Sequence, residues 1–278
     1  MINNPLINEV FRGCLEDFLF GNLVIKNTRS PLILAVFGPT GEGKTFQIDK
    51  ICQSLGISQT IISPGELESE NAGRPAQLLR ELYIGAGTLK KGATHTEPAV
   101  LVINDIDTVL GNWGEMVQYT VNRQTLYGQL MALCDFPNQV SGHTVKRVPI
   151  IITGNNPSIL YPPLLRPGRM RLMPWIPTVK DKAQIVSRIF TGVSMAALEK
   201  LIEKYKEQPI SFWSDIDARL REIKLRAWLN SNSREDLLNS LHSGKEYSMK
   251  ESEVTFGELE KIASDLKNAN ISKKNFLT

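Results

Sequence analysis

The chain has 278 residues, of which 42% are hydrophobic and 22% charged, as expected for a globular protein with a sizeable core. A net charge of +3 without a run of like charges argues against a nucleic acid partner, and no apolar run is long enough to span a membrane. Three scattered cysteines without a C-x-x-C pair favour a reducing compartment such as the cytoplasm, and dispersed histidines exclude a zinc constellation.

Short apolar runs alternate with amphipathic helical patterns up to about Pro174. The runs are almost continuously apolar, which predicts strands of a parallel sheet buried on both faces. The alternation of strands with helices predicts an α/β fold. The predicted strands lie at 31–37, 59–63, 99–104, 148–153 and 172–176, with helices at 45–56, 75–91 and 120–136 between them.

After Pro177 only helical patterns remain. Three helix starts are marked by S/T-x-x-D/E capping boxes that begin at Thr178, Ser233 and Thr255. Further helices are predicted at 194–206 and 212–229. We therefore expect an α/β domain over 1–176, including an N-terminal helical segment at 1–28, followed by a smaller all-helical lid over 177–278.

A phosphate-binding loop follows the first predicted strand. Its sequence fits G-x-x-x-x-G-K-[ST] in full, and a helix follows it, which is the context that this motif requires. The backbone N–H groups of such a loop point at phosphate oxygens, the lysine reaches the β- and γ-phosphates, and the Thr hydroxyl can ligate Mg²⁺. The predicted nucleotide contacts are Gly38, Pro39, Thr40, Gly41, Glu42, Gly43, Lys44, Thr45 and the adjoining Phe46.

The strand at 99–104 ends in polar residues where nucleotide hydrolases hold magnesium. The first of them, Asn104, is an uncharged amide that can still accept a hydrogen bond from a magnesium-bound water. Asp105 has the charge needed to position an attacking water. We predict a magnesium site formed by Thr45, Asn104 and Asp105, although these residues alone leave open whether ATP is hydrolysed or only bound.

Two later stretches add polar residues of the kind that act on phosphate. Asn155 ends the strand at 148–153, where it could contact the γ-phosphate or the attacking water. In the string LYPPLLRPGRM, Arg166 and Arg169 follow a short helix that begins near Pro162. Such arginines often act as fingers on a neighbouring subunit's nucleotide, because a guanidinium spreads positive charge over phosphate oxygens.

The order of these motifs resembles that of the AAA+ ATPases, and the connecting segments resemble Rubisco activase in particular. The segments that carry this resemblance are GELESENAGRPAQLLRELY (65–83), VINDID (102–107), QYTVNRQ (118–124), VPIIITGNN (148–156) and LYPPLLRPGRM (160–170). The resemblance implies an ATP hydrolase that uses ATP and Mg²⁺, with Asn104 as the family's usual residue and Asn155 as a sensor. It implies a hexameric ring of this chain with Arg166 and Arg169 acting in trans, and Arg219 of the lid reading the γ-phosphate.

The resemblance further implies a client and a mechanism. Activases pull on Rubisco through a central pore, which 65–73 and the loop after Asp107 would line here, and release inhibitory sugar phosphates. The location would be the cytoplasm, with carboxysome association as one option, or the chloroplast stroma for an imported form. Two positions depart from the family pattern: Asp217 replaces an arginine of the lid, which would alter coupling between nucleotide and lid, and the segment 108–117 favours as an alternative an AAA+ motor with another protein client. A nucleotide-gated ring scaffold with little hydrolysis is a further alternative.

The four tryptophans have separate predictions. Trp175, Trp213 and Trp228 lie within apolar patterns, so we expect them in the core. Trp113 lies between glycines in a polar loop, so we expect it to be exposed, as a client contact or as part of the loop's own packing.

Overall fold

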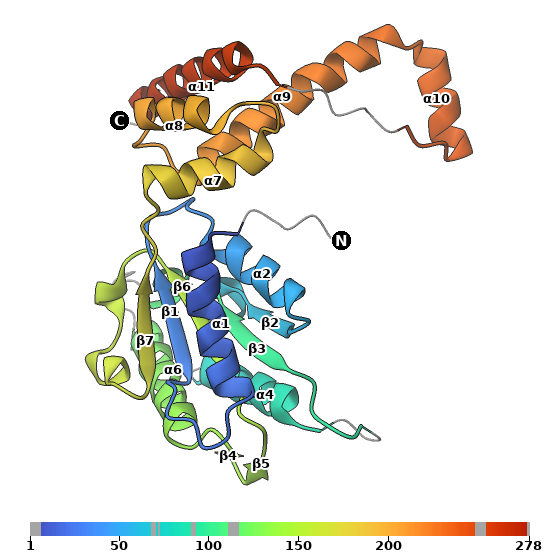
Figure 1. Ribbon diagram of the computed structural model, residues 1–278. Coiled ribbons are helices and arrows are strands. Elements are labelled where there is room, and N and C mark those ends of the chain that lie inside the picture. The colour runs from blue at the N-terminus through green and yellow to red at the C-terminus, as the bar shows by residue number, and fades with distance from the viewer. Residues whose placement is uncertain are drawn as a thin grey trace. The chain divides into compact units, whose positions relative to one another are not determined.

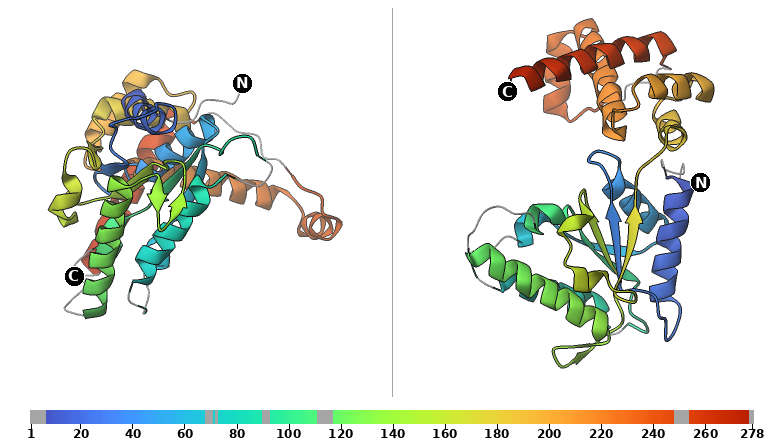
Figure 2. Two further views of the ribbon diagram at one scale, coloured as in Figure 1. Left: turned by 90° about the horizontal axis from the view of Figure 1, so that it is seen from below. Right: turned by 90° about the vertical axis from the view of Figure 1, so that its left-hand side faces the viewer.

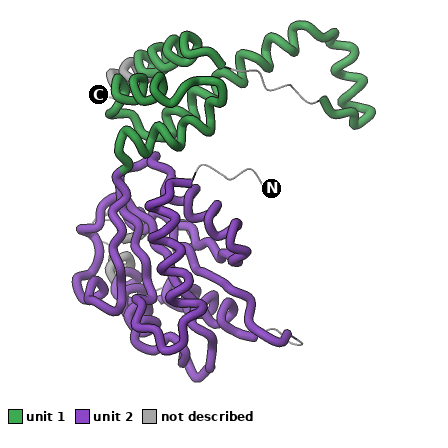
Figure 3. The backbone as a smooth tube through the Cα atoms, in the orientation of Figure 1, with its two compact units in different colours: residues 1–6, 177–278 green, residues 7–176 purple. Residues whose placement is uncertain are grey.

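The chain's structure is a computed structural model that describes residues 7–67, 71, 73–89, 93–110, 117–247 and 254–276. It divides into two compact units, which we treat separately (Figure 3). The sheet unit spans Ile7–Ile176, and the helical unit begins at Pro177. Within the described residues, no helix combines the length and the apolar character that crossing a bilayer requires.

A five-stranded parallel sheet forms the centre of the sheet unit (Figure 1), as predicted. The strand order is β2-β3-β6-β1-β7, so that β1 lies between β6 and β7 and is paired with each over five residues. Every strand begins and ends within two residues of its predicted bounds. The strands are β1 (Ile33–Phe37), β2 (Ser58–Ile62), β3 (Ala99–Ile103), β6 (Ile150–Gly154) and β7 (Met170–Pro174).

Helices cover both faces of this sheet (Figure 2), which explains why its inner strands β1, β3 and β6 are buried at nearly every position and are apolar except at Thr153. One core cluster joins Ile33, Ala35 and Phe37 of β1 to side chains of α4 and α6. Leu34 and Val36 are also fully buried, and successive strand residues point to opposite faces. The helices of this unit are α1 (Glu9–Leu23), α2 (Lys44–Ser54), α3 (Pro64–Leu67), α4 (Arg74–Gly87), α5 (Ile106–Leu110) and α6 (Val117–Asp135).

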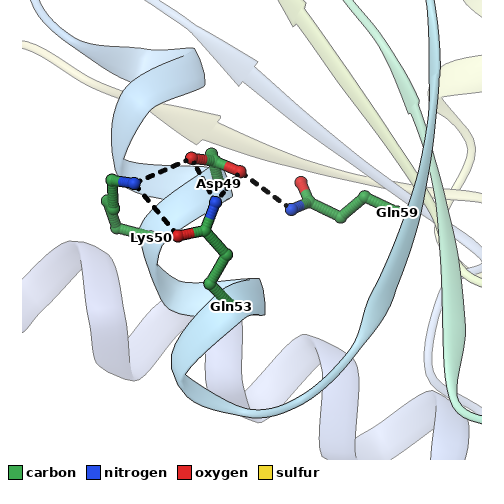
Figure 4. A network of polar contacts seen from close by, with 4 residues as sticks. All are labelled: Asp49, Lys50, Gln53 and Gln59. Atoms are coloured by element: carbon green, nitrogen blue, oxygen red, sulfur yellow. Dashed lines mark hydrogen bonds and ion pairs between the residues drawn. The ribbon is translucent and has the colours of Figure 1, made fainter. Parts of the chain in front are cut away.

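A hydrogen-bond network fastens α2 to the edge strand β2 (Figure 4). Its centre is the Asp49 carboxylate, which accepts hydrogen bonds from Gln53 Nε2 at 2.7 and 2.8 Å and from Gln59 Nε2 at 3.1 Å. Lys50 Nζ lies 3.4 Å from the same carboxylate. The helix that follows the phosphate loop is therefore also held to the edge strand from its middle, at Asp49.

A small hairpin of β4 (Gln139–Val140) and β5 (His143–Thr144) was not predicted. Its turn residues Ser141 and Gly142 have positive φ angles of 49° and 82°. Two positive φ angles in succession match the twist of a tight hairpin, so the Ser-Gly dipeptide was the available signal.

The helical unit consists of helices packed around an aromatic core. Trp213 is fully buried and makes edge contacts with the rings of Tyr205 and Phe212. The predicted helix starts are confirmed: reciprocal capping hydrogen bonds form at Thr178 and Thr255, and the Ser233 hydroxyl accepts from Asp236 N. The helices are α7 (Val179–Ile189), α8 (Met195–Lys204), α9 (Ile210–Ser231), α10 (Arg234–Ser243) and α11 (Phe256–Phe276).

The tryptophan predictions have three outcomes. Trp175 and Trp213 are buried, as expected. The prediction for Trp228 is wrong, because its side chain is only partly buried and packs against the ring of Tyr247. The buried residues of α9 all lie in its first half, up to Leu220, so its apolar pattern continues beyond the core that it packs on. Trp113 lies outside the described residues.

Candidate nucleotide-binding site

The predicted phosphate loop connects the carboxyl end of β1 to the first turn of α2. Gly38 passes so close to Trp175 that a Cβ atom there would lie 1.9 Å from the Trp175 carbonyl oxygen. Gly41 and Gly43 have φ angles of 79° and 74°, which favour glycine. Trp175 also donates a hydrogen bond from Nε1 to the Glu42 carbonyl oxygen at 2.7 Å. The loop is thus fixed in shape by a tryptophan more than a hundred residues away in sequence.

Lys44 lies within this loop with its side chain buried. Its Nζ donates hydrogen bonds to the carbonyl oxygens of Gly38 at 2.7 Å and Pro39 at 2.9 Å, and to Asn155 Oδ1 at 3.0 Å. Burial lowers the pKa of Lys44, while the nearby Asp105 and Asp107 carboxylates oppose that shift. A buried cation at the N-terminus of an eleven-residue helix fits a phosphate group.

The side-chain amide of Asn104, just after β3, faces the phosphate loop. Its Oδ1 accepts hydrogen bonds from the Thr45 hydroxyl at 3.3 Å and from the Thr153 hydroxyl at 3.4 Å. Asp105 follows with its side chain exposed and its N–H donating to Thr153 Oγ1 at 3.0 Å. The three predicted magnesium residues therefore gather hydroxyl, amide and carboxylate oxygens, the donor types that Mg²⁺ prefers.

The Asp105 backbone is in the left-handed region, with a φ angle of 45°. Few residues other than glycine adopt it, and aspartate is among those that tolerate it best. Such backbone outliers concentrate at functional sites, so this one agrees with a role for the β3 end.

Asn155 lies at the end of β6, which is paired with β3. Its side-chain Oδ1 accepts the hydrogen bond from Lys44 Nζ. The Asp107 carboxylate holds the backbone at this point by accepting hydrogen bonds from the N–H groups of Asn155 and Asn156. The sequence did not predict the roles of Thr153 and Asp107 in this site. Nothing in their local patterns shows which strand end lies opposite each of these residues.

The structure distinguishes between the two predicted finger arginines. Arg166 is exposed beyond the short 3-10 helix η2 (Pro162–Leu165). Arg169 forms a bidentate ion pair with Asp135 at the end of α6, through Nε at 2.9 Å and Nη2 at 2.7 Å, and donates from Nη1 to the Pro163 carbonyl oxygen at 3.0 Å. Arg169 is thus bound within its own chain, and Arg166 extends into solvent.

The remaining predicted site residues are Phe46, Arg219 and the two pore segments. Phe46 is 42% exposed on α2, with Lys50 Nζ 5.8 Å from its ring centroid. Arg219 belongs to α9 of the helical unit, where it pairs with Glu222. The predicted pore segments fall largely outside the described residues, which omit 68–70, 72 and 111–116. In the described part of the chain, no His, Cys, Asp and Glu side chains gather into a metal-binding group of three.

Two family models match successive parts of the chain. A family model described as "ATPase family associated with various cellular activities (AAA)" matches residues 34–178. A second model, described as "Ribulose bisphosphate carboxylase/oxygenase activase, AAA, helical", matches residues 179–269. The two matches meet at the junction of the sheet and helical units.

Individual relatives are named as Rubisco activases, in agreement with the second family model. The chain is 40% identical over 237 residues to the ribulose bisphosphate carboxylase/oxygenase activase of Nostoc sp., covering 81% of this chain and 57% of the relative. It is 38% identical to the chloroplastic activase of Zea mays and 39% identical to that of Phaseolus vulgaris, each over 233 residues. These two alignments cover 81% of this chain and 53% and 52% of the relatives. The chain thus spans about half the length of the curated relatives that it matches.

The AAA model covers half of the chain and includes the phosphate loop, Asn104 and Asn155, and the activase helical model continues directly from it. Together with the relatives, these matches confirm the resemblance predicted from the motifs. The chain therefore belongs to the AAA family of ATPases, and its helical unit matches the helical domain of the Rubisco activases.

Proposed function

We propose that this chain binds Mg-ATP at the carboxyl ends of β1, β3 and β6 and hydrolyses it. The observation that carries the proposal is the convergence of Lys44, Asn104 and Asn155 from three neighbouring strand ends. Lys44 would hold the β- and γ-phosphates, and Thr45 and Asn104 would hold the metal with its water shell. The bound Mg²⁺ would supply positive charge to the transferring phosphoryl group.

Asp105 is the group that we assign to the attacking water. Its carboxylate is exposed next to the Asn104 amide, and its backbone is held by Thr153. A carboxylate there can accept a hydrogen bond from water and so orient it. Asn155 would contact the γ-phosphate through its side-chain amide and report the phosphate's presence to β6.

A ring of identical subunits completes the proposed site, with Arg166 reaching the nucleotide of a neighbour. The ion pair of Arg169 with Asp135 supports a different task for Arg169, namely to hold the loop that carries Arg166. A guanidinium added from a neighbour can raise phosphoryl transfer by about 10³-fold or more. Ring formation would then be a condition for hydrolysis.

Arg166→Ala is expected to lower kcat by at least about 10²-fold with little change in ATP affinity, because the arginine acts on the transition state of another subunit. Phosphate release and fluorescent-ATP binding measure the two effects. Arg171→Ala, on an exposed residue of β7, is the control and should keep its activity. A mixture of Arg166→Ala with Lys44→Ala should regain part of the turnover, because each supplies what the other lacks; a mixture as inactive as its components would contradict action in trans.

The client that the comparisons favour is Rubisco, because the relatives that match both units are named as its activases. We propose that ATP-driven changes of the ring release inhibitory sugar phosphates from Rubisco. We propose the cytoplasm, with carboxysome association as one option, or the chloroplast stroma as the location; the relatives from Nostoc sp. and from a chloroplast support the two compartments. The test is recovery of carboxylation by sugar-phosphate-inhibited Rubisco with protein and ATP, against Lys44→Ala as the control.

An alternative client is favoured by the segment 108–117, TVLGNWGEMV, which differs from the small Gly- and Ala-rich stretch of activases. ATP turnover without any recovery of inhibited Rubisco would move the proposal to an AAA motor with another protein client. Ring formation with ATP but negligible turnover would instead indicate a nucleotide-gated scaffold.

A further inference from the structure

Asp107 lies next to the proposed site, but no role in ATP hydrolysis has been assigned to it so far. It is in the first turn of α5, where a carboxylate ordinarily stabilises its own helix through the dipole. Its carboxylate instead reaches across to the end of β6, where Oδ2 accepts hydrogen bonds from the N–H groups of Asn155 and Asn156, the latter at 3.1 Å. A charged acceptor shared by two successive backbone N–H groups fixes the backbone firmly.

The other oxygen of this carboxylate shows how closely the two segments fit. Asp107 Oδ1 is buried and has no hydrogen-bond partner among the described residues. A Cβ atom at Gly154 would lie 2.9 Å from it and 2.4 Å from a ring carbon of Phe37. The carboxylate therefore occupies space that a side chain at position 154 would need, and the end of β6 is shaped around it.

The contact continues from Asp107 to the phosphate-binding lysine. The backbone that Asp107 holds carries the Asn155 side chain, and Asn155 Oδ1 accepts a hydrogen bond from Lys44 Nζ at 3.0 Å. Thr153, two residues earlier, is held to Asn104 and Asp105 through its hydroxyl. Hydrogen bonds on both sides of Gly154 thus set the position of Asn155 relative to β3.

We propose that Asp107 is a positioning residue for ATP hydrolysis, which acts by fixing the backbone of Asn155 so that its side-chain amide meets the γ-phosphate and Lys44. The proposal rests on the proposed hydrolysis and on the role assigned there to Asn155. In this proposal Asp107 acts through Asn155 and not on the nucleotide itself. A displacement of about 1 Å at a group that contacts the reacting phosphate can cost up to about 10²-fold in rate.

The test is a double-mutant cycle between Asp107→Asn and Asn155→Ala, with kcat and ATP affinity measured for each variant. Asp107→Asn keeps the shape of the side chain and one acceptor oxygen but loses the charge. We expect it to lower kcat about tenfold and to leave ATP affinity unchanged within about twofold. In the Asn155→Ala background the same change should have almost no further effect, because the side chain that Asp107 positions is gone.

Asp49→Asn is the matched control, since Asp49 is also a hydrogen-bonded carboxylate of the sheet unit but belongs to the network between α2 and β2. It should leave kcat unchanged in both backgrounds. Equal losses of kcat from Asp107→Asn in the wild-type and Asn155→Ala backgrounds would overturn the proposal, since they would show an effect independent of Asn155. So would an Asp107→Asn variant with unchanged kcat.

A readout without turnover separates this inference from the proposed function. The side-chain amide resonances of Asn155 in the nucleotide-free protein, identified by their loss in Asn155→Ala, should shift in Asp107→Asn and stay in place in Asp49→Asn. If the wild type does not hydrolyse ATP but these resonances shift, the proposed function fails and the positioning of Asn155 by Asp107 stands. Unshifted resonances would overturn the positioning, whatever the turnover.

Discussion

Lys44→Ala is expected to lower kcat/KM for ATP by about 10³-fold. The change removes the only cation that lies within the phosphate loop, and it leaves the Gly38 and Pro39 carbonyl oxygens without the ammonium that they contact. Phosphate release over a range of Mg-ATP concentrations gives kcat/KM, and binding of a fluorescent ATP analogue gives the affinity.

The matched control is Lys50→Ala, on the same helix. Lys50 lies at the surface near Asp49 and Gln53, and exposed pairs of this kind contribute little. Turnover of this variant within about twofold of wild type, beside an inactive Lys44→Ala, would locate the effect in the loop rather than in the charge of α2. If Lys44→Ala retained wild-type turnover, the phosphate would have to bind elsewhere, and the assignment of the site would be wrong.

Gly38→Ala is expected to lower the free energy of unfolding of the sheet unit by about 3 kcal/mol and to abolish nucleotide binding. The added Cβ would lie 1.9 Å from the Trp175 carbonyl oxygen and 2.9 Å from its carbonyl carbon. Both are backbone atoms of a segment that is already hydrogen-bonded to β1, since Trp175 N donates to the Phe37 carbonyl oxygen at 2.6 Å. The clash can be relieved only if the loop or the end of β7 moves.

The control for this prediction is Gly56→Ala, after α2. Gly56 has a φ angle of 64°, but nothing lies within 4 Å of the Cβ position, so only backbone strain of about 1 kcal/mol is expected. Urea unfolding followed by circular dichroism gives both values. Equal losses of stability in the two variants would show that the contact with Trp175 is not what constrains Gly38.

Much of the fold could be predicted because its signals are local. Five apolar runs became the five strands of a parallel sheet, and the capping residues Thr178, Ser233 and Thr255 each start a helix. Trp228 could not be placed, because whether an apolar helix face is covered depends on where the neighbouring helices end. The turn at Ser141 and Gly142 was missed because only two residues pair on each side of it.

The candidate site was predictable up to the point where residues distant in sequence decide its geometry. The phosphate loop, Asn104 and Asn155 were found from motifs at strand ends, and the structure brings them together. The string that contains Arg166 and Arg169 made the two arginines look equivalent. They differ because Asp135 lies opposite only one of them, and this pairing between α6 and a distant loop has no local signal.

The pairing of β1 has a consequence for how the protein is made on the ribosome. β1 and the phosphate loop are synthesised well before β6 and β7, the two strands that flank β1 in the described sheet. Chains emerge from the N-terminus onward, and parallel pairings between distant segments form slowly. β2 and β3 can pair first, while the apolar strand β1 remains unpaired. If ATP binds at the proposed site, it would therefore stabilise the sheet after β6 has joined β1, and it could not guide the earlier pairing of β2 with β3.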